Sequence, residues 1–397
     1  MIIRNGYVFS EEGVFEKKDL YIEDGKVAPG DGVVGPLTPG DGVTGSLTKV
    51  DGISDPLIDA TDCYVIPGLI DIHLHGCAGY DFCDGTKESL SQMAAYELQN
   101  GITSFCPTSM TLPEETLARI FANAALYAEQ NETGARMLGI RMEGPFISDE
   151  KKGAQNGSFI HKPDIEMFMR LQEKAKQCIK LVDIAPEVEG AMECIEALSS
   201  LVRVSIAHTN ADYDTAKKAF EKGASQVTHL YNAMPEFMHR APGVVGAACD
   251  DENVMVELIC DGVHCHPATI RASFKMFGDD RIIFISDSMM ACGLEDGQYT
   301  LGGQAVTVCG NLATLTKDGN LAGSVTNLTD CVRTAVKEMG IPLASAIKCA
   351  TINPAKSLGI AHQYGSLTPG KIADVVILDQ NLELVSVIQA GNLIAIE

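Results

Sequence analysis

The sequence predicts an α/β protein: a (β/α)₈ TIM-type barrel with a small β-sandwich domain formed by the two chain ends. Short apolar runs alternate with longer helical stretches through the middle of the chain, a pattern typical of a parallel sheet covered by helices. Both chain ends have short strand-like runs without helical periodicity. The length of 397 residues suits a barrel of roughly 250 residues with a smaller companion domain.

The small β-domain is predicted to combine residues 1–66 and 360–397. Gly365-Ser366-Leu367-Thr368-Pro369-Gly370-Lys371 is a turn-rich connector, and a β-branched run follows it. Pro67-Gly68 marks the exit from the N-terminal part. Strands are expected at residues 2–8, 20–22, 63–66 and 373–378.

Residues 29–58 contain a decamer repeat rich in glycine and proline, whose third copy has decayed. Such short units cannot build a solenoid core, so we interpret the repeat as a surface hairpin or flexible excursion of the β-domain. Calcium binding or partner docking through Asp31, Asp41 and Asp51 is the less favoured alternative.

The barrel is predicted to span residues 67–359. Eight apolar segments are its candidate strands: 69–73, 102–105, 138–142, 180–184, 202–207, 226–228, 254–260 and 282–286. Helical stretches lie in the gaps, as a closed barrel requires, at residues 88–100, 114–129, 165–175, 191–198 and 215–222.

Composition narrows the classes of partner. The formal net charge of −23 disfavours nucleic acid and anionic membranes, because the field of the protein repels polyanions. The 13 cysteines include no Cys-x-x-Cys pair, which argues against a disulfide framework and a zinc ribbon. No signal-like N-terminus and no apolar run of about 18 residues occurs, so we expect a cytoplasmic protein.

Histidines gather where candidate strands end. His73 and His75 are two apart, so in an extended strand both imidazoles project from one face, roughly 7 Å apart along the chain. Both can then bind one metal. Taken alone, a His-x-His pair is often only packed or hydrogen-bonded, but its place after an apolar strand favours a site at the carboxyl-end rim of the barrel.

Three further strand-end residues complete a mixed nitrogen and oxygen ligand set. Glu143, His208 and His229 each follow an apolar strand, and together they suit zinc or iron(II). Without the two histidines, we would interpret Glu143 as a solvent-exposed carboxylate in a loop.

Asp287 ends the last strand, where an aspartate often only caps a helix. Beside a cation it can accept a proton from water and later deliver it, so we assign it the general-base and general-acid role.

With these residues assembled, the chain resembles the amidohydrolase superfamily, and within it the N-acetylglucosamine-6-phosphate deacetylases. The superfamily features are Pro67-Gly68-Leu69-Ile70-Asp71-Ile72-His73-Leu74-His75-Gly76 and the closing Gly365–Asp374 segment. The deacetylase-like features are Met142-Glu143-Gly144-Pro145-Phe146, Ala207-His208-Thr209-Asn210-Ala211, Thr228-His229-Leu230-Tyr231-Asn232-Ala233-Met234, Asp261-Gly262-Val263-His264 and Ser286-Asp287-Ser288-Met289.

The resemblance implies that the chain removes the acetyl group from N-acetylglucosamine 6-phosphate, using one or two divalent metal ions, zinc or iron. Glu143, His208 and His229 would hold the principal metal, and His73 with His75 a second. Asp287 and His264 would be catalytic. Substrate contacts are implied at Ala154, Gln155, Asn232, Ala233, Arg240, His264, Leu321, Ala322 and Gly323.

The same resemblance implies a homodimer in which Arg240 reaches the phosphate bound by the neighbouring subunit. Without the adjoining motif, Arg240 would be an ordinary surface arginine. Some members of the family carry histidine where this chain has Gln155, so this contact is expected to be a neutral hydrogen bond.

Three alternatives stay open at this point. One is a deacetylase of the galactosamine epimer. Another is a related ring amidohydrolase such as a dihydroorotase, which commonly uses a carbamylated lysine that residues 180–187 do not supply at the end of the fourth strand. The third is a catalytically silent sugar-phosphate sensor, which should lack one of the metal or proton-transfer residues.

Overall fold

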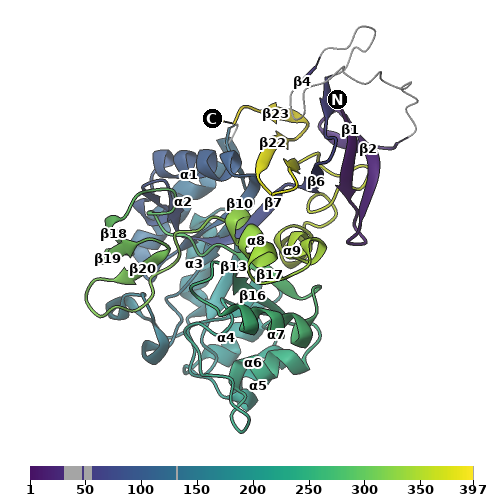
Figure 1. The fold of residues 1–397 in the computed structure, drawn as a ribbon. Coiled ribbons are helices and arrows are strands. Elements are labelled where there is room, and N and C mark those ends of the chain that lie inside the picture. The colour runs from purple at the N-terminus through teal and green to yellow at the C-terminus, as the bar shows by residue number, and fades with distance from the viewer. Residues whose placement is uncertain (31–46, 49–55, 131–132, 397) are drawn as a thin grey trace.

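The computed structural model of the chain describes residues 1–30, 47–48, 56–130 and 133–396. The decamer repeat at 29–58, with its three aspartates, lies largely outside the described residues. Within them the chain forms a parallel barrel covered by helices and a sheet built from both chain ends (Figure 1). None of the described helices has the length and apolar composition that a bilayer span requires.

All eight predicted barrel strands are present. Their side chains are almost entirely buried, since parallel strands in a barrel pack on both faces. The strands are β7 (Leu69–Leu74), β10 (Ile102–Ser109), β12 (Ile140–Met142), β13 (Ile179–Ile184), β14 (Arg203–Ile206), β15 (Gln226–Val227), β16 (Met255–Ile259) and β17 (Ile282–Ile285), with β11 (Arg136–Met137) beside β10. Neighbours from β7 to β17 pair in parallel in chain order, which confirms the predicted barrel.

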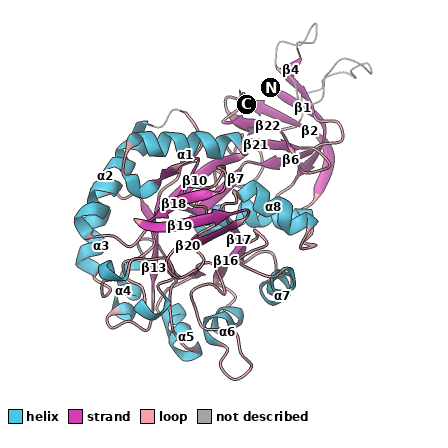
Figure 2. Cartoon of the chain, turned by 60° about the vertical axis from the view of Figure 1, so that its left-hand side comes forward, coloured by secondary structure: helices cyan, strands magenta, loops and turns pink. Residues whose placement is uncertain are grey.

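Helices cover the outside of the barrel (Figure 2). Those predicted are α1 (Lys87–Gln99), α2 (Glu114–Gln130), α3 (Ile165–Lys174), α4 (Ala191–Leu198) and α5 (Tyr213–Glu221). In α2, Leu117, Ile120, Phe121 and Ala124 form one buried stripe at helical spacing. The start of α5 lies two residues before the predicted one, because the Asp212 side chain accepts from the Thr215 N–H and caps the helix.

The second half of the barrel carries helices that the sequence pattern did not reveal. They are α6 (Gly243–Asp250), α7 (Pro267–Phe277), α8 (Leu328–Lys337), α9 (Leu343–Ala350) and α10 (Ile352–Ser357). α6 is apolar around most of its circumference and α10 has only six residues, so helical periodicity is a weak signal for these two. α7 and α8 each bury one face, so the sequence did carry a helical pattern there.

The sheet of the chain ends has the order β23-β22-β21-β6-β1-β2-β3. Antiparallel pairing of β21 with β6 joins the two ends of the chain. Along β1, residues Ile2–Arg4 pair with β5 whereas Tyr7 and Val8 pair with β6, so the sheet branches around its own apolar core. Its strands are β1 (Ile2–Phe9), β2 (Phe15–Glu23), β3 (Lys26–Ala28), β4 (Leu47–Thr48), β5 (Leu57–Asp59), β6 (Tyr64–Pro67), β21 (Val375–Leu378), β22 (Leu384–Gln389) and β23 (Asn392–Ile394). The exact division into residues 1–66 with 360–397 and 67–359 stays a prediction.

A small antiparallel sheet between β17 and α8 was not predicted. It consists of β18 (Gly297–Leu301), β19 (Gln304–Cys309) and β20 (Leu312–Leu315). Gly302 and Gly303 connect its first two strands with φ values of 55° and 80°, which suits a two-residue hairpin turn. This glycine pair was the available sequence signal. Two further short strands, β8 (Gly76–Cys77) and β9 (Tyr80–Asp81), form a hairpin after β7.

Candidate metal centre

A cavity of about 410 Å³ opens at the carboxyl ends of the barrel strands. Most of the residues predicted for the site line it: His75, Glu143, Ala154, Gln155, His208, His229, Asn232, Ala233, His264, Asp287, Leu321 and Gly323. His73 is fully buried in contact with two of these residues, and Ala322 is buried between two lining residues. Tertiary structure therefore brings together side chains that were predicted separately at the ends of six strands.

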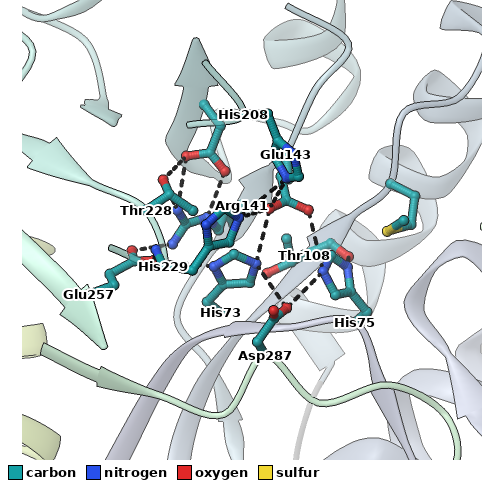
Figure 3. Close-up of polar contacts among 12 residues, drawn as sticks. His73, His75, Thr108, Arg141, Glu143, His208, Thr228, His229, Glu257 and Asp287 are labelled. Atoms are coloured by element: carbon teal, nitrogen blue, oxygen red, sulfur yellow. Dashed lines mark hydrogen bonds and ion pairs between the residues drawn. The ribbon is translucent and has the colours of Figure 1, made fainter. Parts of the chain in front are cut away.

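Two groups of metal-ligating side chains meet in this cavity. One group is His73, His75 and Asp287; the other is Glu143, His208 and His229. Within each group the candidate ligand atoms lie within 4.8 Å of one another. Figure 3 shows the imidazoles and carboxylates turned toward a common centre.

Glu143 lies between the two groups. Its Oε1 is 3.2 Å from His208 Nε2 and 3.3 Å from His229 Nε2. Its Oε2 is 3.3 Å from His75 Nε2. A carboxylate with one oxygen toward each group can serve two cations at once.

The four histidines are oriented by hydrogen bonds on the opposite side of each ring. Nδ1 of His73 lies 3.2 Å from a carboxylate oxygen of Glu257, and Nδ1 of His75 lies 3.1 Å from the carbonyl oxygen of Thr108. Nδ1 of His208 lies 2.9 Å from the Lys151 carbonyl oxygen, and Nδ1 of His229 lies 3.1 Å from that of Asn232. A carbonyl only accepts, so Nδ1 carries the proton and the Nε2 lone pair faces the cavity. This arrangement is the one that metal-binding histidines use.

The donor set fits a divalent cation. Nε2 of His73 is fully buried and forms no hydrogen bond, although carboxylate oxygens of Glu143 and Asp287 lie 3.4 Å away. Burial opposes ionisation of Asp287, but the neighbouring His73 and His75 outweigh it, so the pKa of Asp287 lies well below its ordinary value. A buried, ionised carboxylate among imidazole nitrogens suits zinc or iron(II).

The backbone is unusual at three of the strand ends that supply candidate ligands. His208, His229 and Asp287 have φ values of 43°, 30° and 49°, in the left-handed region that non-glycine residues seldom occupy. Each of the three lies two residues beyond the end of a barrel strand. The side chains of all three residues line the cavity.

A buried ionic network beneath the cavity was missed in the sequence. Arg141 is fully buried and donates to both carboxylate oxygens of Asp183 at 2.9 Å, and it also pairs with Glu257. Glu257 in turn orients His73, so the network connects the barrel interior to the candidate ligands. The available signal was a charged residue inside each of three apolar strands.

Gln155 holds Glu143 directly. Its Nε2 donates to Glu143 Oε2 at 2.6 Å, while its Oε1 accepts from the Thr111 N–H at 2.6 Å. Because a main-chain N–H fixes the oxygen end, the nitrogen end must face the carboxylate. The structure thus places the Gln155 amide on a candidate metal ligand, and its expected hydrogen bond to the substrate stays a prediction.

His264 is paired with Asp261 at the cavity wall. Its Nδ1 is 2.7 Å from Asp261 Oδ2, and both side chains are buried. Burial lowers the pKa of His264, but the bond to Asp261 outweighs this effect, so the pKa of His264 is raised above its ordinary value.

Arg240 is the one predicted site residue that lies apart. It is exposed, its guanidinium donates to His239 Nε2 at 2.7 Å, and it lines a separate surface hollow with Tyr213 and Met238. Within a single chain, Arg240 does not join the residues of the cavity.

Comparison with known proteins gives consistent matches. Residues 64–394 match the amidohydrolase family. The chain is 39% identical to the N-acetylglucosamine-6-phosphate deacetylase of Bacillus subtilis (strain 168) over 336 residues, 84% of this chain and 85% of that protein. It is 36% identical to the N-acetylgalactosamine-6-phosphate deacetylase of Escherichia coli O157:H7 over 328 residues, 82% of this chain and 86% of the other.

Among solved structures, a mutant N-acetylglucosamine-6-phosphate deacetylase from Mycobacterium smegmatis in complex with N-acetyl-D-glucosamine-6-phosphate superposes with a TM-score of 0.88. It is 30% identical in sequence, and the match covers 99% of this chain and 98% of that one.

Proposed function

This chain belongs to the N-acetylglucosamine-6-phosphate deacetylases of the amidohydrolase family, and we propose that it hydrolyses the acetamide of N-acetylglucosamine 6-phosphate with the residues of this cavity. The products are glucosamine 6-phosphate and acetate. One observation supports the proposal above the others: Nε2 of four histidines converges on Glu143, while each Nδ1 is held by a separate oxygen.

We assign the metal positions to the two groups described above. Glu143, His208 and His229 would hold one divalent ion, and His73, His75 and Asp287 would hold a second. Zinc and iron are the candidates, because imidazole nitrogen and carboxylate oxygen suit both. When bound, such an ion polarises a carbonyl and makes water acidic enough to ionise near neutral pH.

The chain's own side chains have distinct roles in the proposed reaction. Asp287 accepts a proton from the attacking water and returns it to the departing amine nitrogen. His264, whose pKa is raised by the bond to Asp261, stabilises the negative charge that develops on the acetamide oxygen. Substrate contacts are assigned to Ala154, Gln155, Asn232, Ala233, Leu321, Ala322 and Gly323.

The galactosamine epimer is the second candidate substrate. The similarity to the Escherichia coli N-acetylgalactosamine-6-phosphate deacetylase is close to that of the glucosamine enzymes, so overall identity does not separate the two epimers. A silent sugar-phosphate sensor fits less well, because every residue that hydrolysis needs is present.

We also propose a homodimer that places Arg240 at the partner's cavity. Phe237 and Met238, on the same exposed loop, are each 51% exposed, and a second copy of the chain would cover them.

The free thiols of the 13 cysteines fit a reducing compartment such as the cytoplasm.

An acetate-release assay tests the function. Purified protein is assayed with both epimeric sugar phosphates before chelation, after chelation and after metal is restored. We expect release from the glucosamine substrate that chelation abolishes and zinc or iron restores. Absence of metal-dependent release from both substrates would refute the deacetylase proposal.

Subunit mixing tests the dimer. Arg240→Ala and Asp287→Asn proteins are each expected to be impaired, and co-refolded mixtures should regain part of the activity if one subunit supplies Arg240 to the other. Analytical ultracentrifugation checks the stoichiometry. A monomer, or mixtures with no recovery, would contradict the shared site.

A further inference from the structure

The cavity wall carries one lysine side chain that has no role in the reaction described above. Among the described residues that line it, Lys151 is the one lysine or arginine. Carboxylates of Glu143, Glu150 and Asp287 line the same cavity. A substrate phosphate entering so acidic a space requires a local positive charge.

The charge of Lys151 is not committed elsewhere. Its ammonium group donates to the Met234 carbonyl at 3.4 Å, beyond the usual range for such a bond. The neighbouring Glu150 carboxylate instead accepts from Asn210 Nδ2 at 2.6 Å. Within the described residues Lys151 forms no ion pair, whereas the next residue, Lys152, pairs with Asp149 at 2.7 Å.

The Met234 carbonyl, which the Lys151 ammonium group contacts, belongs to a turn that offers a further hydrogen-bond donor. Ala233 lies in the left-handed region with φ 53°, and its N–H has no partner among the described residues. The Asn232 N–H, in contrast, donates to the His229 carbonyl at 2.9 Å. An ammonium group beside a free main-chain N–H is a suitable arrangement for a phosphate.

The main chain of Lys151 has a separate task, because its carbonyl accepts from His208 Nδ1 at 2.9 Å. A change of the side chain alone leaves that bond in place. Lys151 thus contacts one candidate metal ligand through its main chain and the turn at Ala233 through its side chain.

We propose that Lys151 binds the substrate phosphate from within its own subunit, together with the Ala233 N–H. This inference rests on the proposed deacetylase function and deepens it. Lys151 makes the enzyme selective for the phosphorylated amino sugar over the free sugar, and it acts in addition to Arg240 of a partner subunit.

The test compares Lys151→Met with Lys152→Met on N-acetylglucosamine 6-phosphate and on N-acetylglucosamine. Methionine keeps the length and removes the charge. For Lys151→Met we expect KM for the phosphorylated substrate to rise about tenfold or more, with kcat within about threefold and kcat/KM for the free sugar unchanged. Lys152→Met should behave like the wild type, and Lys151→Arg should recover most of the lost affinity.

A second measurement does not depend on turnover. Inorganic phosphate, titrated calorimetrically into the metal-loaded wild type and Lys151→Met, should bind the variant about tenfold more weakly. Equal phosphate affinity, or an equal loss on both sugars, would overturn the proposal. If wild-type protein hydrolyses neither sugar phosphate, the deacetylase function fails, while the phosphate titration still decides the role of Lys151.

Discussion

The backbone N–H of Asp287 donates to the carbonyl oxygen of His73 at 2.9 Å, and the two side chains approach to 3.4 Å on the same rim. This contact joins the end of β17 to the end of β7, where the barrel closes. The first and the last strand therefore meet at the candidate metal centre. The proposed proton carrier is held by the main chain as well as by its neighbours.

Asp287→Asn should abolish turnover without loss of the protein fold. Asparagine keeps the size and the main-chain bond to His73 but cannot accept and return a proton, so kcat should fall by about two to four orders of magnitude. Metal analysis should still find an ion, held by Glu143, His208 and His229. Near-normal kcat would show that the proton-transfer assignment is wrong.

Asp261→Asn should change the pH dependence of activity. Asp261 raises the pKa of His264 against the effect of burial, so the protonated imidazole persists to higher pH. Without this negative charge the proton is lost sooner, and the alkaline limb of kcat/KM should move to lower pH. Asparagine can still accept from the main-chain N–H groups of Val263 and His264, which limits structural effects. An unmoved or upward-shifted limb would contradict the assignment.

Gln155→Met should weaken metal binding. The variant loses the 2.6 Å bond that orients Glu143, and loss of such an outer partner typically costs 10–100-fold in metal affinity. Titration of metal-free protein, with counting of bound ions, measures the effect. Gln304→Met is the matched control, because Gln304 donates to the Ala154 carbonyl and does not contact Glu143. Equal metal affinity in both variants would count against a role for Gln155.

Arg141→Met should destabilise the fold strongly. The change leaves the buried carboxylates of Asp183 and Glu257 without their cation, which typically costs about 3–5 kcal/mol in the free energy of unfolding. Urea denaturation measures the difference. Arg170→Met, which removes an exposed ion pair with Glu114, should leave the midpoint nearly unchanged. Similar midpoints for the two variants would contradict a structural role for Arg141.

Local patterns in the sequence predicted most of the architecture. Most barrel strands contain a short apolar run, and a chemically reactive polar residue follows six of them, so strand positions and strand-end ligands could be predicted together. Helices α6 and α10 were missed because a uniformly apolar or a very short segment carries little periodicity, whereas α7 and α8 were missed although each has one buried face. The β18–β20 sheet was missed although Gly302 and Gly303 marked its turn.

The sequence by itself determined the barrel, the family and the identities of the candidate metal ligands, because these depend on residues close together in the chain. Only the tertiary structure decided how those ligands are oriented. His73 is aimed by Glu257, 184 positions away, and Glu143 by the Gln155 side chain, since barrel closure and loop packing bring these partners together. The same packing leaves Arg240 outside the cavity of its own chain and places Lys151 in the cavity wall, a difference that no local pattern encodes.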